Sequence, residues 1–196
     1  MEYSYKFRIY PNVEQRTLIQ KTFGCSRFVY NHFLAQRIAE YTATGKAPTR
    51  FQQDKSLTVL KQEIDWLREP DKCALQNALK DLDSAYKNFF RSAKSGGNIG
   101  FPQFKSKRDR HKSYKTNSNI AISNSHVRLP KLGFVKCRVS KEVRGRILSA
   151  TVSQNPSGKY FVALCCTDVE ITAIWRKGGK SMDDATQGLT ALLGWS

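Results

Sequence analysis

The stretch GFPQFKSKRDRHKSYKT, residues 100–116, separates a helix-forming half of the chain from a strand-forming half. Six of the residues in this basic segment are Lys or Arg, and Asp109 is its one acidic residue. Pro102 restricts φ and lacks an N–H donor, so the backbone around it is not helical. Because burying unpaired charge is costly, we expect the segment to lie on a surface that faces water or phosphate. A run of charge alone is compatible with a solvated loop as well as with a nucleic-acid contact.

The positive charge of the chain is concentrated around this segment. The 196 residues include 33 Lys or Arg and 16 Asp or Glu, which gives a net charge of +17. Residues 1–95 have 16 basic and 10 acidic side chains, residues 96–150 have 13 and 2, and residues 151–196 have 4 of each. A localised positive field of this kind is typical of proteins that bind polyanions such as nucleic acids.

The composition argues against several other classes of protein. No apolar run approaches the roughly 18–20 residues that span a bilayer, and the N-terminus lacks the apolar core of a signal peptide. We therefore expect a cytoplasmic protein with no membrane partner. The five cysteines are odd in number and form no Cys-x-x-Cys pair, and the three histidines are scattered. The sequence thus predicts neither a disulfide framework nor a metal site.

The N-terminal half is predicted to be one strand followed by helices. Apolar and polar side chains alternate over residues 3–10, which is the period of a strand. Asn12 and Gln15 have the spacing of a capping box. Apolar stripes with helical spacing then extend to about residue 95. We predict a first helix that Gly24 breaks or bends, a second from about Ser26 to Thr44, a third marked by Leu57 to Leu67 after a polar link over residues 49–53, and a fourth with Asp71 as its cap that ends at Gly96.

The C-terminal half is predicted to be a small sheet. Short strand candidates cover residues 120–122, 127–129, 134–138, 147–153 and 160–166, and the last two form a hairpin around the turn at residues 155–158. Such spacing suggests a barrel or a sandwich. The strand over residues 3–10 has no other partner, so we expect it to join this sheet.

The predicted fold class is therefore α+β, a small β-barrel interrupted by a helical bundle. The domain boundaries that follow are residues 1–11 for the first strand of the barrel, 12–95 for the helical domain, 96–171 for the basic linker and the rest of the barrel, and 172–196 for a tail without a clear pattern.

One helix face has the residue types that read DNA bases. Lys72, Gln76 and Lys80 are spaced i, i+4, i+8 and lie on one side of the predicted fourth helix. Gln pairs with adenine and Lys with guanine or phosphate in the major groove. The same spacing is also that of an ordinary solvated helix face, and the pattern does not separate the two interpretations.

Eight short motifs occur in a familiar order over residues 3–170. They are FRIYP (7–11), FVYNHF (28–33), WL (66–67), ALQNAL (74–79), AYKNFF (85–90), GFPQF (100–104), SY (113–114) and LPKLG (129–133). Together they resemble the TnpB (OrfB) proteins of bacterial insertion sequences, which are often labelled transposases and are related to compact type V CRISPR nucleases.

The resemblance implies a fold and a set of partners. It implies an OB-like "wedge" barrel interrupted by a helical recognition domain, and a role in RNA-guided DNA cleavage. The implied partners are a guide RNA from the transposon end and a double-stranded DNA target with a short adjacent motif, in the nucleoid of a bacterium or archaeon.

The chain departs from the family where the nuclease domain is expected. In the family that domain opens with a Gly-[Ile/Val]-Asp-[Leu/Val]-Gly strand, whereas Asp168 and Glu170 come too early and lack the glycines. Asp183 and Asp184 have no third carboxylate partner of the kind that two-metal chemistry needs. We therefore expect no catalytic residue and no cofactor in this chain. Mg²⁺ and Zn²⁺ are expected only for the nuclease domain, which suggests a truncated or frame-disrupted copy that is inactive alone.

The resemblance and the charge pattern together nominate two sets of site residues. The residues implied to read the DNA motif are Lys72, Gln76, Arg50, Phe51, Thr116 and Asn117. The residues expected to bind phosphate or RNA are Lys105, Lys107, Arg108, Arg110, Lys112, Tyr114 and Lys115.

Three functional hypotheses follow from the sequence. The chain is a recognition module that binds RNA and DNA without cutting, or one part of a nuclease whose catalytic half is encoded elsewhere, or a generic basic RNA-binding protein without guided DNA recognition.

Overall fold

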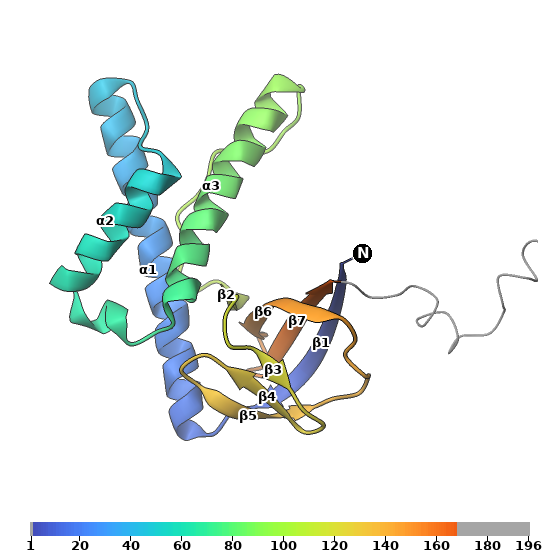
Figure 1. Cartoon of the computed structure of the whole chain (residues 1–196). Helices are drawn as coiled ribbons and strands as arrows, with labels where there is room; N and C mark the ends of the chain where they lie inside the picture. Colours follow the sequence, from blue (N-terminus) through green and yellow to red (C-terminus); the bar gives the residue numbers. More distant parts are fainter. Residues whose placement is uncertain (1, 168–196) are drawn as a thin grey trace, which may run out of the picture.

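The computed structural model describes residues 2–167 as an α+β fold (Figure 1). The helices within these residues are α1 (Val13–Thr44), α2 (Arg50–Glu63), the 3₁₀ helix η1 (Asp65–Arg68) and α3 (Lys72–Lys94). The strands are β1 (Tyr3–Tyr10), β2 (Lys112–Thr116), β3 (Ala121–Ile122), β4 (His126–Leu129), β5 (Gly133–Arg138), β6 (Arg146–Gln154) and β7 (Tyr160–Thr167). The predictions made for the tail and for Asp168, Glu170, Asp183 and Asp184 lie outside the described residues.

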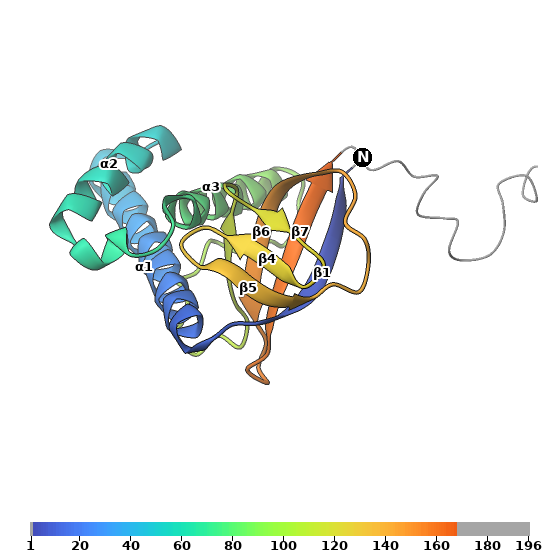
Figure 2. The ribbon, with the colours of Figure 1, turned by 60° about the horizontal axis from the view of Figure 1, so that its bottom comes forward.

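The strands form one antiparallel sheet with the order β2-β6-β7-β1-β5-β4-β3. β1 pairs with β7 from Tyr3↔Cys166 to Ile9↔Tyr160 and with β5 on its other side. The prediction that the first strand joins the C-terminal sheet is therefore confirmed, and α1, α2, η1 and α3 all lie between β1 and β2 in the chain. Closure into a barrel is not confirmed, because β2 and β3 are the two edges of the seven-stranded sheet. Figure 2 shows the curvature of this sheet.

One face of the sheet packs against the N-terminal parts of α1 and α3. Tyr5, Phe7 and Ile9 alternate along β1 and are buried, as the period-2 pattern predicts. They share one hydrophobic core with Phe23 of α1 and Ala74 of α3. The N-terminal third of α1 and the first turn of α3 thus pack on the sheet, which holds both helices in a set position relative to the strands.

The helix α1 begins at the predicted capping box. Asn12 Oδ1 accepts from the Gln15 N–H at 2.8 Å, and the Asn12 N–H donates to Gln15 Oε1 at 3.0 Å. The predicted break at Gly24 is wrong, because α1 continues to Thr44. A glycine lowers helix propensity by only about 1 kcal/mol, and burial of flanking residues such as Phe23 and Val29 outweighs that. The helix ends at Gly45, whose φ of +69° is left-handed.

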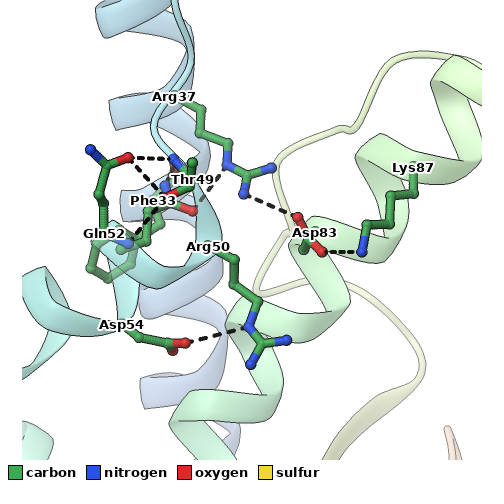
Figure 3. Close-up of polar contacts among 9 residues, drawn as sticks. Phe33, Arg37, Thr49, Arg50, Gln52, Asp54, Asp83 and Lys87 are labelled. Atoms are coloured by element: carbon green, nitrogen blue, oxygen red, sulfur yellow. Dashed lines mark hydrogen bonds and ion pairs between the residues drawn. The ribbon is translucent and has the colours of Figure 1, made fainter.

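A second hydrophobic core lies between α1, α2, η1 and α3. The buried side chain of Arg37 packs beside it. Arg37 Nε donates to Gln53 Oε1 at 3.0 Å, and its Nη2 contacts Asp83 Oδ1 at 3.3 Å (Figure 3). Its guanidinium also lies 4.9 Å from the centre of the Tyr86 ring. Arg37 therefore joins α1, α2 and α3 through one side chain.

Candidate nucleic-acid interface

The polar face of α3 is exposed at the start of the helix. Lys72, Gln76 and Lys80 are exposed, whereas Leu75 and Leu79 on the opposite side are fully buried. The side chains predicted to read bases are therefore accessible, and they lie on a regular helix rather than on a loop.

Buried and partly buried polar bonds hold this end of α3 against β2 and the residue that follows it. Thr116 Oγ1 donates to Asp71 Oδ2 at 2.6 Å. Asn77 Nδ2 donates to the Lys115 carbonyl at 2.8 Å and to Asn117 Oδ1 at 2.6 Å. Asp71 occupies the N-cap position, but its carboxylate makes no capping bond to the helix backbone. The predicted side-chain cap is wrong because Thr116 engages that carboxylate instead.

The structure divides the predicted motif-reading residues into three groups. Lys72, Gln76 and Asn117 are exposed and lie at the same end of α3. Thr116 is only 1% exposed and its hydroxyl is already bonded to Asp71. In this structure it therefore holds α3 in place and does not present a group to a base. The sequence pattern missed Asn77, whose amide brings Asn117 to the helix.

Arg50 and Phe51 form the third group and lie on α2, away from the start of α3. They occupy the first turn of α2 rather than a link, because Thr49 and Gln52 form a second capping box. Phe51 is 68% exposed and the Lys55 ammonium lies 4.7 Å from its ring centre.

The Arg50 side chain projects from α2 toward α3 in Figure 3 and pairs with Asp54 at 3.3 Å. The neighbouring part of α3 carries Asp83 and Lys87, which pair at 2.9 Å. Burial acts to raise the pKa of Asp83, but the hydrogen bonds from Lys87 and Arg37 outweigh it and hold that pKa below its ordinary value. Asp83 follows Gln76 by seven residues, about 10 Å along a helix that rises 1.5 Å per residue.

The basic segment lies on the surface, as its charge predicts. Residues 103–111 are all exposed. Asn31 of α1 holds the start of this stretch, because its amide donates to the Lys105 carbonyl at 2.9 Å and accepts from the Lys105 N–H at 2.8 Å. A turn follows in which Asp109 accepts from the Ser106 N–H at 3.0 Å. The exposed cations Lys107, Arg108 and Arg110 are thus presented by a segment that is attached to α1 at its base.

The end of the basic segment is the edge strand β2, which the sequence pattern did not predict. Lys115 is exposed, Lys112 is half-buried, and Tyr114 is only 7% exposed. The Tyr114 ring meets the Phe23 ring edge to face at 5.7 Å. Burial, and then the nearby charge of Asp71, raise the pKa of Tyr114. The side chain of Tyr114 belongs to the hydrophobic core, so in this structure it does not face a phosphate.

The part of the chain that the structure describes has no cluster of metal-ligating side chains. No group of three or more His, Cys, Asp or Glu side chains within residues 2–167 is arranged to hold an ion. None of the helices in that part of the chain is long and apolar enough to cross a membrane.

Comparison with known proteins gives one matching family model. It is described as a helix-turn-helix domain, is named for the OrfB proteins of IS605, and matches residues 1–46. In the structure, residues 3–44 of this match form the strand β1 and the single continuous helix α1. Two helices joined by a turn are therefore not found within the described part of the match.

Several curated proteins match most of the chain. It is 32% identical over 169 residues to the "Putative RNA-guided DNA endonuclease InsQ" of Escherichia coli K12, and 31% identical over 171 residues to a "Putative RNA-guided DNA endonuclease" of Streptomyces pristinaespiralis. These alignments cover 82% and 84% of this chain but 39% and 41% of the relatives, so the chain spans about two fifths of their length. It is also 32% identical over 111 residues to the virulence protein VsdF of Salmonella dublin, which covers 52% of this chain and 91% of that protein.

Proposed function

This chain belongs to the TnpB (OrfB) family of insertion-sequence proteins, and we propose that it is the nucleic-acid-binding part of a transposon-encoded RNA-guided DNA endonuclease. Its partners in this proposal are a guide RNA from the transposon end and a double-stranded DNA target. The curved sheet serves as the wedge domain of the family, and the helices between β1 and β2 serve as its recognition domain.

One observation carries this proposal. The exposed Lys72 and Gln76 lie on a helix whose start is bonded through Asp71 and Asn77 to β2, the strand that ends the basic segment. Base-reading groups are most effective when a rigid element holds them in place. The nearby basic segment supplies sequence-independent attraction to phosphate, which positions a duplex without specifying its sequence.

The proposed roles follow this geometry. Gln76, Lys72 and Asn117 read the motif beside the target, and Arg50 and Phe51 contact the same duplex further along α3. Phosphate contacts come from Lys105, Lys107, Arg108, Arg110, Lys112 and Lys115. Thr116 and Tyr114 have structural roles in this proposal.

A binding comparison tests the proposal against the alternative of a generic RNA-binding protein. Full-length protein is titrated with transposon-end RNA and with a scrambled RNA of equal length at the same salt concentration. Guided recognition predicts tighter binding of the transposon-end RNA, and a protein–RNA complex that selects one motif from a DNA library. Equal affinity for both RNAs and no selected motif would favour the generic protein.

We also propose that the chain alone does not cut DNA. Purified protein with Mg²⁺, the cognate RNA and target DNA should leave the DNA intact. Cleavage that is lost on Asp168→Ala would identify a catalytic carboxylate in this chain and would overturn the proposal.

A further inference from the structure

A pocket of about 170 Å³ lies between α1, α3, the basic segment and β2. Its apolar wall is formed by Phe23 of α1, Ala74 and Ala78 of α3, and Tyr114 of β2. The two alanines leave space that longer side chains on α3 would fill. Because an apolar cavity of about 150 Å³ holds one benzene ring, the pocket has room for one aromatic ring.

The lining of the pocket has four Lys or Arg side chains and two carboxylates, those of Asp81 and Asp109. The cations are Arg27, Lys105, Lys112 and Lys115, which come from α1, the basic segment and β2. Lys105 is exposed as a residue, but its ammonium lies 4.1 Å from the centre of the Tyr30 ring. Partial loss of water around the ammonium lowers its pKa, although Asp81 and Asp109 oppose this. An inorganic phosphate would use only these cations. A nucleotide would use both parts, with its ring on the apolar wall and its phosphates on the lysines.

Two further groups could select the base. Asp81 lines the same pocket, and burial raises its pKa although Lys105 and Lys115 act in the opposite direction. Asp81 nevertheless remains exposed to solvent, so its carboxylate can accept an N–H donor of a ligand that enters the pocket. Ser26 also lines the pocket, and its buried Oγ has no hydrogen-bond partner within the described residues.

We propose that the pocket binds one unstacked pyrimidine nucleotide of the bound RNA, and cytosine in preference to uracil. The proposal rests on the proposed RNA binding. Proteins commonly recognise single-stranded RNA by bases that are splayed out of the stack. A carboxylate such as that of Asp81 accepts from the N4 amino group of cytosine. Uracil presents a carbonyl oxygen at that position, which Asp81 would repel.

The test uses the full chain and two labelled RNA octamers, one of cytidine and one of uridine. Fluorescence anisotropy at a fixed salt concentration should give tighter binding of the cytidine octamer, by at least about 5-fold for one base-specific contact. Asp81→Asn should remove the preference, because the amide both donates and accepts. Ser113→Phe, at an exposed rim position, should fill the pocket and also remove it.

Lys107→Gln is the control, since Lys107 lies in the basic segment but does not line the pocket. It should weaken binding of both octamers and leave their ratio unchanged. Equal binding of the two octamers by the wild type, or an unchanged ratio in Asp81→Asn and Ser113→Phe, would overturn the pocket and leave RNA binding intact. Failure to bind either octamer would overturn RNA binding as well. Free CMP that binds as tightly as the octamer would identify a mononucleotide site instead of an RNA contact.

Discussion

Thr116 of β2 donates its hydroxyl to the Asp71 carboxylate at the start of α3 over a distance of 2.6 Å. Both side chains are buried. Asp71 immediately precedes the exposed Lys72, and Thr116 belongs to β2, which follows the exposed cations of the basic segment. The bond therefore links the start of α3 to the end of that segment. Because a buried carboxylate is costly without a partner, Thr116 contributes to the interface by positioning α3.

Replacing Thr116 by Val should destabilise the fold. The change keeps the β-branched shape but leaves the Asp71 carboxylate buried without its donor, which costs about 1–3 kcal/mol of unfolding free energy. Urea denaturation measures this loss. Thr116→Ser keeps a hydroxyl and should lose clearly less, so equal losses in both variants would mean that the hydrogen bond is unimportant.

Replacing Gln76 by Ala should weaken recognition of the DNA motif. A bidentate contact with a base contributes about 1–3 kcal/mol of discrimination, which corresponds to about 5–150-fold in affinity for the preferred motif. Affinity for the guide RNA and for unrelated DNA should hardly change. A motif-library selection on both proteins measures the effect, and recovery of the same motif with equal strength would show that Gln76 contacts no base.

Neutralising the basic segment should reduce the salt dependence of RNA binding. Lys107, Arg108 and Arg110 are exposed, and each phosphate contact contributes about 0.7–0.9 to the slope of log affinity against log salt. The triple Gln variant should therefore have a slope shallower by about 2–3 units. A control with Lys141, Arg146 and Lys159 changed to Gln removes the same charge elsewhere on the surface. If both variants change the slope equally, the basic segment has no special role.

Replacing Arg37 by Ala should be far more damaging than replacing Arg50. The side chain of Arg37 is 7% exposed in its pair with Asp83, whereas that of Arg50 is 44% exposed in its pair with Asp54. Breaking a buried pair costs about 3–5 kcal/mol, and an exposed pair contributes about 0–1 kcal/mol. Unfolding free energies of the two variants test this, and similar losses would contradict the packing around Arg37.

The stability of the fold should fall in alkali. Burial raises the pKa of the Cys137 thiol from 9.0 to about 11. Between these values the folded state holds a proton that the unfolded state has released, so the unfolding free energy decreases as the pH rises. Denaturant unfolding at pH 8, 9.5 and 11 should show a smaller decrease for Cys137→Val than for the wild type. Parallel profiles would indicate that other groups, such as buried tyrosines, cause the loss.

Local signals in the sequence were sufficient for several elements. The capping box of Asn12 and Gln15, the end of α1 at Gly45, the alternation along β1 and the hairpin of β6 and β7 all depend on residues close together in the chain. The break predicted at Gly24 failed because a weak local preference was outweighed by burial of the neighbouring side chains.

The sequence alone determined that the chain is α+β, that its first strand joins the C-terminal sheet, and that positive charge gathers around residues 96–150 on an exposed segment. Those properties follow from hydrophobic period and from the cost of burying charge. Only the tertiary structure decided which polar residues remain available to a ligand. Asp71 and Thr116 are 45 positions apart. Nothing in that spacing predicts that the Thr116 hydroxyl would donate to the Asp71 carboxylate. The burial of Tyr114 depends in the same way on Phe23, a contact between distant segments that local pattern does not encode.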